Sequence, residues 1–521
     1  MPYRLLLLHT GAFGENYGVY VQHVETLRWL LADDPQWEVV TMDALHPQLA
    51  AAALESDLVI AGMSGAPELE SLMRLRRARG LRTIFEITDN FLGLGTWVTP
   101  HNLLHSPLAR QSVVFHAHLA DAVQVYAPPL AELFRGVNER IVVFDPYVPL
   151  PDALPEKEPG FVFGWGGTRS HRDDLAAIAP AIAEFCARHD DAVFSYMGDA
   201  SLFEELFAAI PSSQKRWRAY GDYDDYLEFV RTLHAGLAPL APSPFNAARS
   251  DTKVITYFAC GAAAIAQDAA VYGGHRERAL LFDEPAALLA HLETLYGDRQ
   301  LLRALTRSAF EWVRAHRSRE ALHAQRVDCY RALVPASPLG APPIDAAPPY
   351  AARLGEAMGR EPAEALTIVR EVLAEAPEYP QAQWFCVRVL EALGREEEAL
   401  DYADSVAPPP LFADLFAEAQ TRLARKVRPE VAESYAARVA SPVRRARLAQ
   451  VQGGEPLAFY RSVLEAQPYD FFALSAVIRL LSKSNPDAPE LPALFARAAL
   501  VAPASVPRDR RPAALEAFLP R

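Results

Sequence analysis

Two stretches of the chain place glycines, hydroxyl groups and basic side chains between a short apolar run and a helical pattern. The first is FVFGWGGTRSHR at 161–172, and the second is GLAPLAPSPFNAARSDTKVITYFACGAAAIAQD at 236–268. In a parallel α/β sheet such loops lie at the carboxyl ends of strands, where ligands bind. Backbone N–H groups at a helix start, helped by Arg169, Arg172, Arg249 and Lys253, suit a ligand that carries phosphate.

The composition is that of a globular chain with several domains. Its 521 residues indicate about three domains, and 51% hydrophobic and 22% charged residues are ordinary values. The net charge of −14 argues against nucleic acid or an anionic membrane surface as the main partner. The four cysteines form no C-x-x-C pair, which favours reduced thiols and a cytoplasmic location. We expect no transmembrane segment, because no apolar run is long enough.

Apolar runs alternate with helical patterns in two successive series, which predicts an α/β fold of two Rossmann-like lobes with parallel sheets. The first lobe is expected at 1–150 and the second at 151–334, with a proline-rich connector where they meet. The strands are expected at Tyr3–His9, Glu38–Met42, Asp57–Ala61, Arg82–Ile87, Ala122–Tyr126 and Arg140–Phe144, then at Phe161–Trp165, Ala192–Met197, Arg218–Tyr220, Gly236–Leu240, Ala262–Ala266 and Ala279–Phe282. Two such lobes form a cleft, which is a common place for small-ligand sites.

A second proline-rich linker at 335–349 precedes a region of different character. Residues 350–521 are rich in Ala, Leu, Glu and Arg and predict an all-α domain of helical hairpins. One unit resembles a tetratricopeptide repeat through Leu393-Gly394-Arg395 and Glu398-Ala399-Leu400, and a weaker copy covers 458–482. Helical pairs of this kind present a concave face to partners.

The second lobe resembles the donor-binding half of retaining glycosyltransferases of the GT-B fold, in particular the group-1 enzymes often numbered family four. The matching motifs occur in order and span about 110 residues; they are Phe163-Gly164-Trp165-Gly166-Gly167, His171, Asp174-Leu175, Tyr196-Met197-Gly198, Gly236-Leu237-Ala238-Pro239-Leu240, Pro244-Phe245-Asn246, Ser250-Asp251-x-Lys253 and Tyr257-x-Ala259-x-Gly261. The first lobe matches only through a glycine loop that includes Gly14 and through Asp89-Asn90 after a strand.

The resemblance implies transfer of a sugar from a UDP-, GDP- or dTDP-sugar, with retention of configuration and with neither a metal nor another cofactor. Enzymes of this fold meet the charge of the leaving diphosphate with Arg, Lys and helix N-termini. We expect catalytic roles for Lys253, Arg172, His118 and Asp89. The donor and its phosphates are expected to contact Gly14, Gly166, Gly167, Thr168, Arg169, His171, Asn246, Ser250, Asp251, Lys253 and Thr256. The helical domain is expected to bind an acceptor glycan or protein, or to mediate self-association.

Two positions depart from the family pattern. Relatives carry a glutamate where this chain has Thr256, and the upstream acid of the same motif is replaced by Ala248. A hydroxyl accepts a hydrogen bond from a ribose less strongly than a carboxylate does. The chain therefore also fits an adaptor that binds ligand or partner without turnover. A two-lobed nucleotide-sugar epimerase is a third option, which gives the helical domain no obvious purpose.

Other polar groups have plainer interpretations. His116 and His118 fit structural or surface positions, and Asp89-Asn90 fits a helix cap or turn. The stretch Gly221-Asp222-Tyr223-Asp224-Asp225 contains an acid-x-acid triplet and precedes a helical pattern, so we predict helix capping and no metal. The basic residues of 438–447 and 508–511 fit solvated helix faces, with an acidic partner or anionic acceptor as the alternative.

Overall fold

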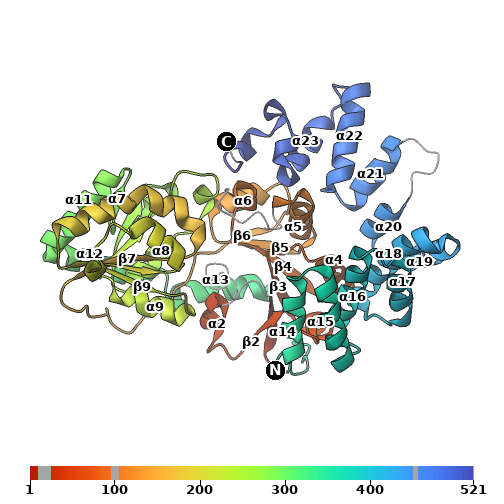
Figure 1. Ribbon diagram of the computed structural model, residues 1–521, viewed down its shortest axis with the longest axis horizontal. Helices are drawn as coiled ribbons and strands as arrows, with labels where there is room; N and C mark the ends of the chain where they lie inside the picture. Colours follow the sequence, from red (N-terminus) through yellow and green to blue (C-terminus); the bar gives the residue numbers. More distant parts are fainter. Residues whose placement is uncertain (10–24, 95–104, 450–455, 520–521) are drawn as a thin grey trace.

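The chain folds into two α/β lobes and a helical C-terminal region, as predicted. The computed structural model describes residues 1–9, 25–94, 105–449 and 456–519. Lobe one lies at the centre of the molecule, lobe two on one side of it, and the helical region on the other side and above (Figure 1). Each lobe contains a six-stranded sheet in which the neighbouring strands are parallel.

Lobe one has the strand order β2-β1-β3-β4-β5-β6. The strands are β1 Tyr3–His9, β2 Trp37–Asp43, β3 Leu58–Gly62, β4 Arg82–Ile87, β5 Ala122–Val125 and β6 Ile141–Val143. The helices are α2 Thr26–Leu31, α3 Leu49–Glu55, α4 Glu68–Ala78, α5 Pro107–Leu119 and α6 Pro128–Phe134. The central strands are buried on both faces, which explains their continuous apolar runs.

Lobe two has the strand order β12-β11-β10-β7-β8-β9. The strands are β7 Phe161–Gly166, β8 Ala192–Met197, β9 Lys215–Arg218, β10 Ala235–Ala238, β11 Ala263–Gln267 and β12 Ala279–Phe282. The helices are α7 Arg172–Arg188, α8 Ala200–Phe207, α9 Tyr223–Thr232, α10 Thr252–Ala259, α11 Pro285–Gly297 and α12 Arg299–His316. The order reverses direction between β7 and β10, so the loops that follow these two strands flank the switch point where ligands bind in such sheets.

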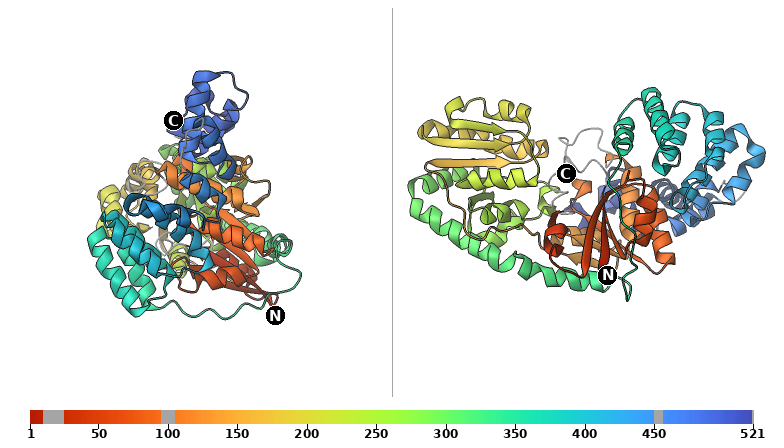
Figure 2. Two further views of the ribbon diagram at one scale, coloured as in Figure 1. Left: turned by 90° about the vertical axis from the view of Figure 1, so that its right-hand side faces the viewer. Right: turned by 90° about the horizontal axis from the view of Figure 1, so that it is seen from below.

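After α12 the chain returns to lobe one through α13, Arg319–Arg331. Leu322, Val327 and Tyr330 of this helix are buried in one hydrophobic cluster with strands β1, β3 and β4. The buried Arg326 guanidinium lies 3.9 Å from the centre of the Phe144 ring and donates to the Tyr330 hydroxyl over 3.1 Å. Helix α13 therefore packs on the first lobe although it follows the second in sequence, and Figure 2 shows the green helices α12 and α13 following one another along the edge of the molecule from lobe two to lobe one.

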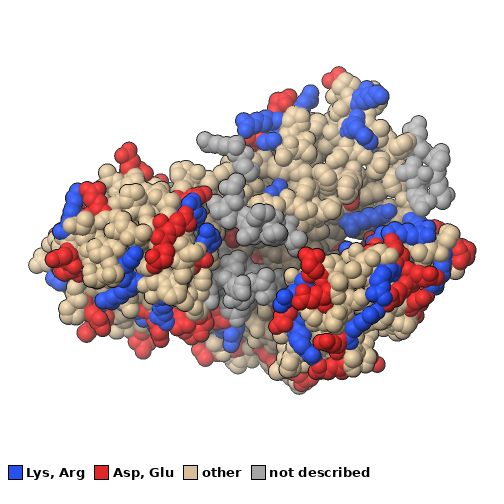
Figure 3. Space-filling view, in the orientation of Figure 1, with Lys and Arg blue, Asp and Glu red and all other residues tan. Residues whose placement is uncertain are grey.

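In the described part of the C-terminal region, all regular secondary structure is helical. Its helices are α14 Pro349–Met358, α15 Pro362–Glu375, α16 Pro380–Ala392, α17 Glu396–Ser405, α18 Pro410–Val427, α19 Ala432–Ala436, α20 Pro442–Leu448, α21 Pro456–Ala466, α22 Phe471–Ser484, α23 Leu491–Val501 and α24 Ala513–Glu516. The predicted Leu393-Gly394-Arg395 turn joins α16 to α17, with Gly394 at a φ of 69°, a left-handed conformation that glycine adopts without strain. Acidic and basic side chains mix on the face of these helices seen in Figure 3.

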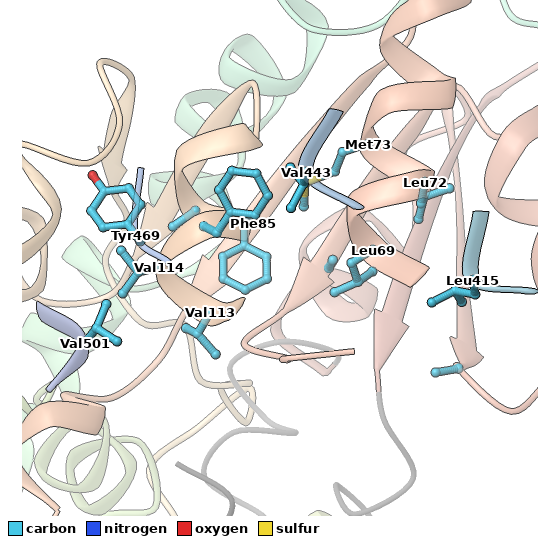
Figure 4. Close-up of a cluster of buried hydrophobic side chains, with 14 of the residues drawn as sticks. Leu69, Leu72, Met73, Phe85, Val113, Val114, Leu415, Val443, Tyr469 and Val501 are labelled. Atoms are coloured by element: carbon cyan, nitrogen blue, oxygen red, sulfur yellow. The ribbon is translucent and has the colours of Figure 1, made fainter. Parts of the chain in front are cut away.

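The helical region and lobe one share a hydrophobic cluster. Leu69, Leu72 and Met73 of α4 pack with Leu415 of α18 and Val443 of α20, as Figure 4 shows. Buried charges reinforce this contact, since Ser441 Oγ donates to Glu70 over 2.9 Å and Arg444 donates to the Pro67 carbonyl over 2.8 Å.

The linker at 335–349 is also tied to lobe one. The Leu339 amide donates to Asp57 over 2.8 Å, and the Asp345 amide donates to Gln48 over 2.9 Å. All four cysteines are unpaired. Among the described residues, every helix is too short or too polar to cross a bilayer.

Candidate functional site

The turn after β7 brings the lobe-two sheet close to α9 and α10. The Gly167 amide donates to the Met197 carbonyl of the neighbouring strand over 3.0 Å. A Cβ on Gly166 would come within 2.8 Å of the Tyr226 ring. A Cβ on Gly167 would come within 2.8 Å of the Trp165 ring and 3.4 Å of Lys253 Nζ. Both glycines are therefore required by close packing, and one of them lies directly beside Lys253.

Lys253 lies in the first turn of α10 and points at the Gly166–Gly167 turn. Its ammonium donates to the Gly166 carbonyl over 2.6 Å and lies 4.8 Å from the centre of the Trp165 ring. Burial lowers the pKa of Lys253 to about 7, and the nearby Arg249 lowers it further, while Asp174 opposes the change. The charged form of this lysine thus lacks full compensation by the protein.

Asp174, in the first turn of α7, holds together the two loops that flank the switch point. Its carboxylate accepts hydrogen bonds from His171 Nδ1 over 2.7 Å, from the Ala241 amide over 2.7 Å and from Asn246 Nδ2 over 2.9 Å. His171 in turn packs edge-on against Trp165. Burial lowers the pKa of His171 to about 4 even though the bond to Asp174 opposes the change, so this imidazole is neutral at pH 7.

Arg249 connects this cluster to the other lobe. Its guanidinium lies 4.4 Å from the centre of the Phe245 ring and donates to Asp89 of lobe one over 3.1 Å. Next to Asp89, the buried Asn90 donates to the Pro244 carbonyl of lobe two and to the Phe518 carbonyl near the C-terminus, each over 3.0 Å. The two lobes are therefore in direct contact beside the site.

The structure brings together several of the predicted site residues, namely Gly166, Gly167, His171, Asn246 and Lys253. Trp165, Asp174 and Arg249 complete this cluster; the sequence named Arg249 as a basic residue suited to phosphate, and Trp165 and Asp174 only as motif residues without a site role. The spacing of His171 and Asp174 at i and i+3 is the signal that could have identified the carboxylate, because these positions face each other at a helix start.

The two predicted arginines contact acidic groups of α8, one at its N-cap and one within the helix. Arg169 donates to Asp199 over 3.1 Å and to Ser201 over 2.7 Å. Arg172 donates to Glu205 and, over 3.3 Å, to Asp173. Each therefore has carboxylate partners within lobe two, in contrast to Lys253. The Thr168 hydroxyl lies 2.6 Å from that of Ser170.

The residues before and within α10 have partners of their own. The Ser250 and Thr252 hydroxyls lie 2.8 Å apart. Asp251 accepts from His275 over 2.8 Å and from Arg317 over 3.1 Å. Thr256 is only 1% exposed, and its hydroxyl donates to the Thr252 carbonyl one turn earlier in the helix over 2.7 Å.

The lobe-one candidates occupy different edges of their sheet. His118 is in the last turn of α5, whereas the carboxyl ends of the strands lie near the starts of the helices that follow them. Its ring is 3.0 Å from the Val137 carbonyl and contacts Tyr469 of the helical region. Asp89 follows β4 at the carboxyl edge and faces Arg249. Gly14 lies outside the described residues.

Two residues of the acidic stretch 222–225 cap α9. Asp222 accepts from the Asp225 amide over 2.9 Å, and the Asp222 amide donates to the Asp225 carboxylate over 3.1 Å, which confirms the predicted capping role. Within the described part of the chain, no group of three or more His, Cys, Asp or Glu side chains is arranged to hold a metal ion.

No family model and no curated protein matches the chain. Among solved structures, Anabaena HepE in complex with UDP and glucose is 14% identical with a TM-score of 0.45, and the match covers 64% of this chain and 100% of that one. The pneumococcal O-GlcNAc transferase GtfA in complex with UDP and GlcNAc is 14% identical with a TM-score of 0.41, over 54% of this chain and 57% of that one. A mutant O-GlcNAc transferase of Thermobaculum terrenum is 17% identical with a TM-score of 0.39, over 64% and 67%.

Proposed function

We propose that this chain is a glycosyltransferase that takes a sugar from a nucleoside-diphosphate donor at the lobe-two site around Lys253. The position of the Lys253 ammonium carries the proposal. It is partly buried at the start of a helix, beside a second cation, and its protein hydrogen-bond partner is the uncharged Gly166 carbonyl. A phosphate group would supply the negative charge that this position lacks.

The proposed chemistry follows from where charge develops. As the bond between the sugar and the diphosphate breaks, negative charge grows on the departing phosphate. Lys253, Arg249 and the amides at the start of α10 would stabilise this charge. Because these cations belong to the chain itself, we propose transfer that needs neither a divalent metal nor another cofactor. Retention of the anomeric configuration, implied by the family resemblance, is part of the same proposal.

We assign acceptor binding to lobe one and the helical region. A groove of about 710 Å³ lies along α15 and the turn before α17, and its lining includes Leu366, Arg370, Glu371 and Arg395. Apolar and charged groups side by side suit a polypeptide better than a bare sugar, so we propose that this groove holds a protein acceptor.

A second candidate is an adaptor that binds nucleotide without turnover. Two positions favour it. Ala248, which replaces the upstream acid, is buried in the hydrophobic cluster of lobe one, and Thr256 uses its hydroxyl inside α10. Neither position offers a carboxylate to a bound donor.

A donor panel separates the two candidates. The protein is incubated with UDP-, GDP- and dTDP-sugars, with and without EDTA, and release of the nucleoside diphosphate is followed. We expect turnover with one base, unchanged by EDTA and abolished by Lys253→Ala. Binding of a nucleotide by calorimetry without turnover of any donor would favour the adaptor. A protein that neither binds nor turns over any of them would exclude both.

A further inference from the structure

One ion pair joins the two lobes at the edge of the candidate site. Asp89 extends from the end of β4 in lobe one, and Arg249 precedes α10 in lobe two. The distance between Arg249 Nη1 and Asp89 Oδ1 is 3.1 Å, and the side chains are 24% and 18% exposed. The pair is thus largely removed from water, where an ion pair is screened less than at the surface.

Arg249 belongs to the same cluster of charges as Lys253. Its positive charge disfavours the protonated forms of both Lys253 and His171, which places it near both. Asp174 already accepts from three donors inside lobe two. Asp89 is therefore the carboxylate that is paired with Arg249 in this cluster.

We propose that Asp89 is an internal competitor for the anion site, which holds Arg249 until the phosphates of a nucleoside diphosphate take its place. This inference rests on the proposed function of the Lys253 site. Binding exchanges an Arg–carboxylate pair for an Arg–phosphate pair, both of which are charge-assisted. Because Asp89 belongs to lobe one, the exchange also releases a tie between the lobes and links donor binding to their arrangement.

The proposal gives Asp89 a role opposite in sign to that of a catalytic or acceptor-binding carboxylate. If Asp89 competes with phosphate, then Asp89→Asn strengthens nucleotide binding. If Asp89 assists the reaction, the same change leaves the affinity unaltered and lowers turnover. Simple removal of a negative charge near a dianion would also strengthen binding, but this effect would not depend on Arg249.

A double-mutant cycle tests the exchange by calorimetry with UDP, GDP and dTDP. The proteins are wild type, Asp89→Asn, Arg249→Gln and the double variant, all as full chains. We expect Asp89→Asn to tighten binding about fivefold, which corresponds to about one kcal/mol. In the Arg249→Gln background the same change should give no gain.

Asp145→Asn is the matched control. Asp145 pairs with Arg317 where the chain crosses back to lobe one, so its loss also removes an ion pair between lobe one and the segment after α12 without touching Arg249. We expect it to change affinity less than twofold. Equal or weaker binding by Asp89→Asn, or an equal gain in both Arg249 backgrounds, overturns the competition while leaving the proposed function intact. Absence of nucleotide binding by every protein in the set overturns both.

Discussion

Two lysines of lobe two lie at opposite ends of α10. Lys157 donates to the carbonyls of Cys260 and Arg231, each over 2.7 Å, at the C-terminal ends of α10 and α9. Lys253 lies at the N-terminal end of α10, where the helix dipole disfavours a cation. Burial lowers the pKa of both groups, to about 8 for Lys157 and about 7 for Lys253.

The difference between the two helix ends distinguishes Lys157, whose position folding explains, from Lys253, for which we propose a functional role. At its end of the helix, Lys157 satisfies two backbone carbonyls and complements the dipole, so folding explains it fully. Lys253 opposes the dipole, lies near Arg249 and has the Trp165 ring and one carbonyl as partners. A cation at the N-terminal end of a helix goes against the local electrostatic preference, and such exceptions are expected at functional sites.

The largest expected effect is on stability, and it comes from Asp174, the carboxylate that holds together the loops beside Lys253. Asp174→Ala removes one buried acceptor and leaves three donors without it. We expect the free energy of unfolding to fall by about 3 kcal/mol, because hydrogen bonds to charged groups are the strong ones and unsatisfied donors add a penalty. Urea denaturation followed by tryptophan fluorescence measures this. Asp174→Asn, which keeps the shape and one acceptor, should lose less; equal stability of all three proteins would contradict the role of Asp174.

At the other end of the helix, Lys157→Met should lower stability without changing nucleotide affinity. The methylenes of the side chain keep their packing, but the Cys260 and Arg231 carbonyls lose their donor. We expect the free energy of unfolding to fall by about 2 kcal/mol, with nucleotide affinity unchanged. The comparison between the two lysines fails if Lys157→Met weakens nucleotide binding in the folded protein.

Lys253→Met should show the reverse pattern. It removes a cation from an unfavourable end of the helix and one hydrogen bond, so stability should change by less than about 1 kcal/mol. Affinity for the nucleoside diphosphate should fall about tenfold or more, since a charge-assisted bond to phosphate is lost. Calorimetry measures the nucleotide affinity of this variant and of Lys157→Met. Similar affinities of the two variants would contradict the proposed role of Lys253.

Much of the fold was predictable because buried parallel strands are continuous apolar runs. The bounds of β4 and β8 agree with prediction, since both are central and apolar. Strand β9 begins at Lys215, three residues before the expected start at Arg218, because this edge strand has no buried residue and carries the exposed Trp217. The return of α13 to lobe one was not expected, since an amphipathic pattern does not indicate which sheet the helix covers.

The candidate site was less predictable than the fold because its ion pairs join residues far apart in the sequence. Lys253 was nominated from a local motif, and its partner Gly166 comes from the other loop at the switch point. Arg169 and Arg172 match the same phosphate-binding chemistry locally, yet their partners Asp199 and Glu205 lie on α8. The pair of Asp89 and Arg249 joins different lobes, a relation that no local pattern encodes.

The smallest effect, and the one most specific to Lys253, concerns pH. With its pKa lowered to about 7, half of this lysine is neutral at pH 7, whereas only the charged form suits a phosphate. Affinity for a nucleoside diphosphate should therefore fall about fivefold between pH 7 and pH 8 and then level off near the affinity of Lys253→Met. Arg249 and His171 share the site, but a guanidinium keeps its charge and His171 is neutral throughout this range, so neither contributes to the slope.

The same proton affects stability in the opposite direction, which makes the measurement decisive. Between about pH 7 and the ordinary pKa of lysine, the unfolded chain holds a proton that folded Lys253 has lost, so this group adds stability as pH rises. A decline in affinity over this range therefore cannot come from unfolding caused by Lys253. In Lys253→Arg the cation persists, and binding should be flat from pH 7 to pH 9. An equally steep decline of affinity in that variant would assign the titration to another group, and Lys253 would then have only a structural role like that of Lys157.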